Sequence, residues 1–177
     1  MRAPHALLAI ALAAGGCAMS VSGELPEVEV TQHDLSVPGL PRELRTGDVS
    51  VSVPTFFQPN DRIGLPVDSY DSVKVTGVTL ILKKGGGGDL TFLRSLRVSL
   101  GSLQDFVAGA APTEVARYDR PSTGPVGTTI EAGKGPVEVV DAWKAPTTVM
   151  TLEASGDLPE DAWTVDVVVR MSALLRY

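Results

Sequence analysis

The sequence has very few of the residues from which most enzyme and metal sites are built. Its 177 residues include one cysteine and two histidines, and 21 acidic side chains against 15 basic ones give a formal net charge of −6. A single cysteine excludes an intrachain disulfide and a zinc site made of cysteines. With two histidines, the chain has few side chains from which to build a histidine metal centre or a histidine-based proton relay. The acidic balance argues against a nucleic-acid partner, which requires a basic face.

Aromatic residues and long helical patterns are also scarce. Aromatic residues make up 5% of the chain, and no amphipathic helix of three turns can be traced through its 18 glycines and 13 prolines. The hydrophobic content of 44% is nevertheless too high for a disordered protein. At this length the chain can bury a core as one domain.

The motifs of nucleotide binding and nucleophilic catalysis are missing. The glycines at Gly127 and Gly133 are one residue too far apart for a phosphate-binding loop, and no Ser or Thr follows Lys134. A Gly-x-Ser-x-Gly elbow is absent. His33 lies within a predicted strand, where we expect a surface or hydrogen-bonded role. We therefore predict no catalytic residue, cofactor or metal ion, and expect that the protein is not an enzyme.

The chain does contain repeated alternation of apolar and polar residues. Apolar side chains occupy every odd position from Trp163 to Tyr177, which predicts an antiparallel strand with one buried and one solvated face. The same period extends from Val49 to Val53, where Pro54 is expected to end the strand. It recurs over residues 73–82 with a change of phase that predicts a β-bulge at Gly77.

The remaining segments complete the pattern of an all-β protein. Residues 27–37 favour a strand, residues 83–89 are typical of a hairpin tip, and residues 90–100 predict one helical turn leading into a strand. Shorter candidate strands cover residues 113–118, 128–132, 137–143 and 147–154. We predict a single antiparallel β-sandwich, immunoglobulin-like, of about eight or nine strands over residues 27–177.

The amino-terminal residues resemble the signal peptide and lipobox of bacterial lipoproteins. Arg2 precedes an apolar run from Ala6 to Ala14, which is too short to span a bilayer, and Gly15 and Gly16 lead to Cys17. Ala14 stands where that family most often has Leu. The resemblance implies a cleaved signal over residues 1–16, acylation of Cys17 and a lipidated tether over residues 17–26. The alternative is an ordinary secretory signal in which the cysteine is incidental.

This resemblance implies a location and a set of partners. A lipid on Cys17 would anchor the domain to a membrane of the bacterial cell envelope, and Ala18 after it favours the outer membrane. The expected partner is then an envelope protein or a glycan. The protein would act as a lipid-anchored, non-enzymatic binding or structural module.

Part of the domain also resembles the small immunoglobulin-like sandwiches of the late-embryogenesis-abundant, water-stress type. The resemblance rests on the strand at Val49–Val53, then on Gln58-Pro59-Asn60, the segment 64–67 and the return strand at 75–78. It covers about thirty residues and implies a sandwich.

Aromatic residues supply the candidate contacts. Trp143 is the better candidate for an exposed aromatic and could stack on a sugar with Tyr70 or Tyr118, whereas Phe56 and Phe57 cap one end of the sandwich or mark a contact surface. Two alternatives stay open: a carbohydrate-binding or glycan-processing envelope protein, and a small outer-membrane β-barrel, which the alternation ending at the carboxyl terminus would suit.

Overall fold

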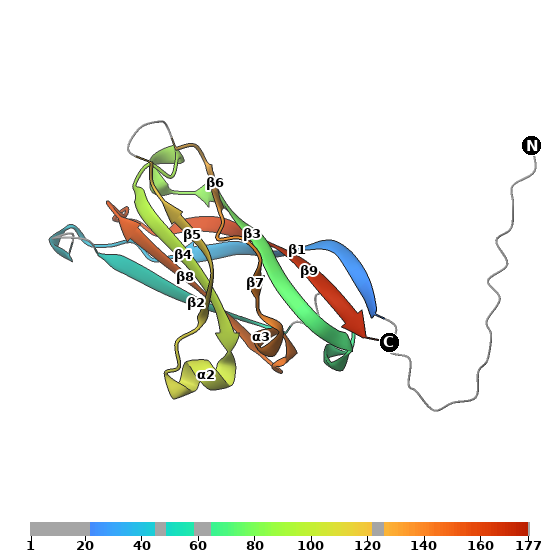
Figure 1. The fold of residues 1–177 in the computed structure, drawn as a ribbon. Coiled ribbons are helices and arrows are strands. Elements are labelled where there is room, and N and C mark those ends of the chain that lie inside the picture. Colours follow the sequence, from blue (N-terminus) through green and yellow to red (C-terminus); the bar gives the residue numbers. More distant parts are fainter. Residues whose placement is uncertain (1–21, 45–48, 59–64, 122–125, 177) are drawn as a thin grey trace, which may run out of the picture.

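The computed structural model describes residues 22–44, 49–58, 65–121 and 126–176, and Figure 1 shows their arrangement. Most of them lie in nine strands: β1 (Ser22–Val37), β2 (Ser50–Phe57), β3 (Tyr70–Lys84), β4 (Leu93–Ser102), β5 (Thr113–Asp119), β6 (Thr129–Ala132), β7 (Val137–Glu138), β8 (Thr148–Gly156) and β9 (Trp163–Arg176). The helical elements are α2 (Leu103–Ala108), α3 (Val140–Lys144) and the 3-10 turns η1 (Arg42–Leu44), η2 (Val67–Ser69) and η3 (Gly86–Gly88). No helix in these ranges is long and apolar enough to cross a membrane.

The strands form two antiparallel sheets. The first sheet has the order β1-β9-β3-β6, with β7 also paired to β3, and the second has the order β2-β8-β4-β5. Strands β1 to β4 alternate between the sheets along the chain, so the connections cross repeatedly from one sheet to the other. This order defines a jelly roll. The prediction of an antiparallel β-sandwich with about eight or nine strands is confirmed, whereas the barrel alternative is wrong because the strands form two separate sheets.

The inner faces of the two sheets form the core. On β9 the alternation places Trp163, Val165 and Val167 on the buried side, and they pack with buried residues such as Leu96 and Leu152 of the second sheet. On β2 and β9 the apolar side chains that pack in the core alternate along the strand, so their period of two follows from burial of one face. On β8, by contrast, five consecutive residues from Thr148 to Leu152 are buried.

Two irregularities expected from the sequence are present. The pairing of β3 with β9 shifts register between Val75 and Gly77, which confirms the predicted bulge. The phase change in β1 corresponds to a second shift, between Gln32 and Leu35. β1 begins at Ser22, earlier than the start at residue 27 expected from the pattern, because Ser22 already lies opposite Arg176 of β9.

Three local predictions need correction. Pro54 does not end β2, because β2 is an edge strand and pairs only with β8, so the missing N–H of proline is tolerated. Residues 83–89 are not the tip of a hairpin, because β3 and β4 belong to different sheets. Residues 137–143 are strand only at Val137–Glu138 and then turn into α3, where the Val140 amide donates to the Glu138 carboxylate at 3.2 Å.

Residues 90–100 largely follow the prediction. The backbone N–H of Leu93 donates to the carbonyl of Leu90 at 3.0 Å, which closes one turn, and β4 begins at Leu93. The spacing of the leucines is compatible with a helix and with a strand. Residues from Leu93 onward form a strand because β4 pairs with β8.

Candidate contact surface

The three aromatic residues predicted as contacts lie in different environments. Trp143 is 1% exposed, so the prediction that it is exposed is wrong. Its ring meets Phe57 edge to face with centroids 6.2 Å apart, and Tyr70 at 6.4 Å. Tyr70 is buried as well, and this burial raises the pKa of its hydroxyl. Trp143 and Tyr70 are therefore packed inside the sandwich and present no face to a sugar.

Phe56 is the predicted contact residue that reaches solvent. It is 51% exposed, and its ring meets that of Phe106 edge to face, with centroids 6.0 Å apart. The alternation along β2 explains the difference between neighbours, because Phe57 turns toward the core while Phe56 points outward. A contact role for Phe56 and Phe57 stays a prediction.

Exposed apolar side chains gather at this end of the molecule. Of the five large apolar side chains that are exposed in the described ranges, four lie here, and we call them the apolar end patch: Phe56, Leu103, Phe106 and Val107. The fifth, Leu44, lies in η1, ahead of the opposite end of β2. Three of the four residues come from α2, and no residue of that helix is buried.

Helix α2 is held in place by its ends and by one ring. Ser102 caps its amino terminus by accepting a hydrogen bond from the Asp105 amide at 3.0 Å. Gly109 ends the helix with a φ of 72°, in the left-handed region that glycine adopts without strain. The ring of Phe106 meets that of Phe56 on β2, and Phe106 and Val149 of β8 line the same small cavity. This helix was not predicted from the sequence, although the pair Ser102 and Asp105 has the spacing of a capping box.

A groove lies beside the apolar end patch, between α2 and the segment that joins α3 to β8. It has a volume of about 700 Å³, and Figure 1 shows α2 and α3 at the same end of the sandwich. Leu103, Val107 and Pro146 supply apolar walls. Asp141 and Lys144, both exposed, bring charges of opposite sign to the same groove.

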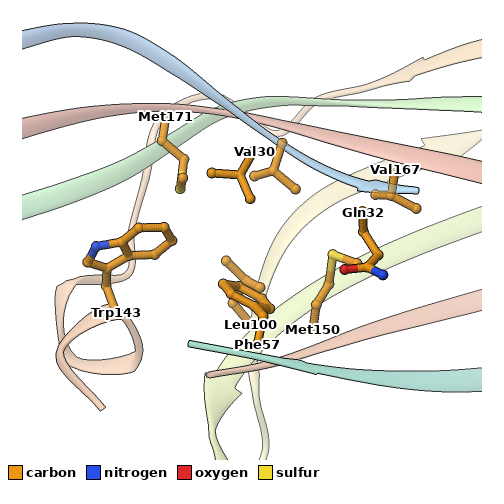
Figure 2. Close-up of a pocket in the computed structure, with 9 residues that line it drawn as sticks. Val30, Gln32, Phe57, Leu100, Trp143, Met150, Val167 and Met171 are labelled. Carbon is orange, nitrogen blue, oxygen red and sulfur yellow. The ribbon is translucent and has the colours of Figure 1, made fainter. Parts of the chain in front are cut away.

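A second cavity lies between the sheets and is closed to large ligands. Figure 2 shows Gln32 of β1 reaching toward Met150, with Trp143 and Met171 on the other side. The free space is about 10 Å³, which accommodates about one water molecule. This cavity is a feature of core packing and does not offer a binding site for an organic ligand.

One charged cluster lies on the outer face of the first sheet. The Asp166 carboxylate accepts hydrogen bonds from the Asp34 amide at 3.0 Å and from His33 Nδ1 at 3.2 Å, and Lys83 Nζ lies 3.5 Å away. The amide of Asp34 is the main cause that lowers the pKa of Asp166; burial opposes this effect, and His33 and Lys83 add to it. Within the described ranges His33 contacts Asp166 and no hydroxyl group, so this cluster holds strands together and contains no nucleophile paired with a base.

The described residues bring together no group of three or more His, Cys, Asp or Glu side chains that could hold a metal ion. A second carboxylate, that of Glu138, accepts hydrogen bonds from two backbone amides and from one hydroxyl. Burial alone would raise the pKa of Glu138, but hydrogen bonds from Ser72 and from the Val73 and Val140 amides lower it below the usual value. These bonds attach the start of α3 to β3.

Comparisons with known proteins returned only structural likeness. No family model matches the chain, and no curated protein matches it. Among solved structures, the match to a chain of Cocksfoot mottle virus covers 99% of this chain and 94% of that chain, at 10% sequence identity and a TM-score of 0.40. The decameric BFDV capsid protein covers 89% and 100% at 8% identity and a TM-score of 0.43. Desmodium yellow mottle tymovirus covers 98% and 96% at 5% identity and a TM-score of 0.34.

These findings correct the identification made from the amino terminus. The named structures are those of viruses and a viral capsid protein, and neither a bacterial lipoprotein nor a water-stress protein is among them. The predictions of a bacterial lipoprotein, an outer-membrane location, and a membrane or glycan partner are therefore wrong. The likeness itself, at these identities and TM-scores, is one of fold. Cys17 lies outside the described residues.

Proposed function

We propose that this protein is a non-enzymatic structural subunit that associates with further copies of itself through the apolar end patch. The single observation that carries the proposal is that four of the five exposed large apolar side chains of the described ranges meet at one end. Surface apolar residues are normal when scattered, whereas contiguous ones rimmed by polar groups mark sites of protein contact.

The construction of α2 supports this interpretation. A helix of six residues is too short to be stable by itself, and this one buries none of its side chains. The chain nevertheless positions it with a serine cap, a left-handed glycine and the Phe106 contact with Phe56. Rigidly held aromatic side chains lose little conformational freedom on binding, so they suit the centre of an interface.

The capsid structures compared above do not carry the proposal. One of them is named as a decamer, which is a statement about that protein. A jelly roll serves several unrelated functions, so the fold alone does not assign one. The apolar end patch of this chain is what supports self-association.

The test is the oligomeric state of the full chain by sedimentation velocity over a range of concentrations. We expect the wild type to form oligomers as its concentration rises, and Val107→Ser and Phe56→Ser to weaken association about tenfold or more. Val107 is 78% exposed, so its replacement leaves the core untouched. The matched control is Leu44→Ser, which removes a side chain that is 58% exposed outside the patch and should leave association unchanged.

Two results would overturn the proposal. One is a wild type that stays monomeric at its highest soluble concentration. The other is a Leu44→Ser variant that weakens association as much as Val107→Ser does, because the patch would then have no special role.

A further inference from the structure

The short helix α3 carries an unused pair of charges. Asp141 lies in its first turn and Lys144 in its last, and both side chains are exposed and line the groove. Their spacing of three residues permits an ion pair within the helix. Neither side chain forms an ion pair with any residue of the described ranges, so both charges are free to pair with a group on another molecule.

We infer that a second copy of the chain occupies the groove, related to the first by a two-fold axis that sets the two α3 helices antiparallel. In this arrangement Lys144 of one copy faces Asp141 of the partner subunit, and the second pair forms by symmetry. The inference rests on the proposed function and names the geometry of that association.

The shape of this end of the molecule favours a two-fold arrangement. A two-fold interface uses the same surface on both copies, so every protrusion must find its recess on an identical surface. The exposed helix α2 forms one side of the groove of about 700 Å³, where Leu103 and Val107 line it opposite Pro146. One rotation therefore brings the exposed helix of each copy to the groove of the other.

The charges favour a second copy over an unrelated partner. A partner chosen for one sign of charge would meet a groove lined by a single sign, whereas this groove contains Asp105, Asp141 and Lys144. Antiparallel helices bring the first turn of one to the last turn of the other, so the acid and the base pair reciprocally. With a net charge of −6 on each chain, such pairs set orientation, while the apolar side chains supply most of the affinity.

The test is a charge exchange measured by sedimentation velocity on the full chain. Lys144→Glu places two acids opposite each other, and Asp141→Lys places two bases opposite each other, so each variant alone should associate at least tenfold more weakly. An equimolar mixture of the two variants restores both pairs and should associate nearly as well as the wild type. The double variant Lys144→Glu with Asp141→Lys should also associate nearly as well as the wild type, because it restores both pairs with the charges exchanged.

Matched controls separate local from global charge. Lys84→Glu changes the net charge by the same amount as Lys144→Glu, at an exposed residue at the end of β3, and should leave association unchanged. Glu131→Lys on β6 is the counterpart for Asp141→Lys. Emission of buried Trp143, the central residue of α3, shows whether each variant retains its fold.

The outcomes distinguish the two claims. If Val107→Ser weakens association but neither charge variant does, the proposed function stands and the two-fold arrangement is wrong. If both single variants associate more weakly than the wild type and their mixture does not regain association, the pairing of Lys144 with Asp141 is wrong. If the wild type is monomeric throughout, the proposed function fails and this inference fails with it.

Discussion

The carboxylate of Asp166 on β9 accepts a hydrogen bond from the backbone N–H of Asp34 on β1 at 3.0 Å. Asp34 has a φ of 51°, in the left-handed region, and lies within the register shift between Gln32 and Leu35. The acid therefore satisfies an amide that the bulge removes from the ladder of sheet hydrogen bonds. His33 and Lys83 complete its surroundings.

Replacing Asp166 with Asn should lower the free energy of unfolding by about 1–3 kcal/mol, because a carboxylate that is 7% exposed loses its charge-assisted hydrogen bonds. Urea denaturation at neutral pH measures the change. Asp157→Asn is the control, since that exposed acid forms a surface ion pair with Arg94 at 3.4 Å, and its replacement should change stability by less than about 0.5 kcal/mol.

The contribution of Asp166 should depend on pH. Its pKa is lower in the folded protein than its ordinary value, so the stabilisation is present in full above about pH 5 and is lost as the pH falls through the folded pKa. The stability of the wild type should therefore fall more steeply on acidification than that of Asp166→Asn. Parallel curves for the two proteins would contradict this account, and Glu138 affects both equally.

Replacing Glu138 with Gln should loosen the start of α3. Glu138 accepts hydrogen bonds from the Ser72 hydroxyl and from the Val73 amide at 2.8 Å. Burial acts to raise the pKa of its carboxyl, and together with the Val140 amide these bonds bring the pKa below its usual value. We expect a loss of about 1 kcal/mol, a figure reduced by solvent screening because this acid is exposed. Urea denaturation measures it, with Glu131→Gln on the neighbouring β6 as the control that should change little.

Replacing Trp143 with Ala should cost about 3–5 kcal/mol, because it leaves a cavity among Phe57, Tyr70 and their neighbours. The wild type should also show blue-shifted tryptophan emission that iodide barely quenches, since Trp143 and Trp163 are 1% and 0% exposed. Strong quenching in the folded protein would show that a tryptophan is exposed and would contradict this packing.

Replacing Gly39 with Ala should destabilise the protein by more than about 2 kcal/mol, because the added Cβ would overlap the carbonyl oxygen of Glu160. This contact accompanies the hydrogen bond from the Leu40 amide to the Pro159 carbonyl at 2.7 Å. Gly133→Ala is the matched control, since its Cβ would meet nothing within 4 Å. Thermal unfolding compares the two, and equal melting temperatures would refute the argument.

Several elements could be predicted because their signal is local. The alternation from Trp163 onward identified β9, and the change of phase at Gly77 located the bulge, since burial of one face imposes a period of two on any strand. The capping spacing of Ser102 and Asp105 was also present, but α2 is too short for a hydrophobic period to reveal it.

The candidate site could be predicted only in part. Alternation next to Phe56 and Phe57 indicates that one of them faces outward, but it does not say which. Phe106 acquires its role through contact with a residue fifty positions away. Trp143 follows a strand-like run, yet the carboxylate of Glu138 starts a helix there and turns the indole into the core.

The sequence by itself determined that this protein is an all-β sandwich and that its single cysteine permits no intrachain disulfide, because composition and the period of two are properties of the chain. Only the tertiary structure decided that β1 lies beside β9 and β2 beside β8, and that α2 stands exposed next to a groove. These relationships join residues distant in sequence, as Gly39 and Glu160 show, and such pairings depend on how the sheets pack.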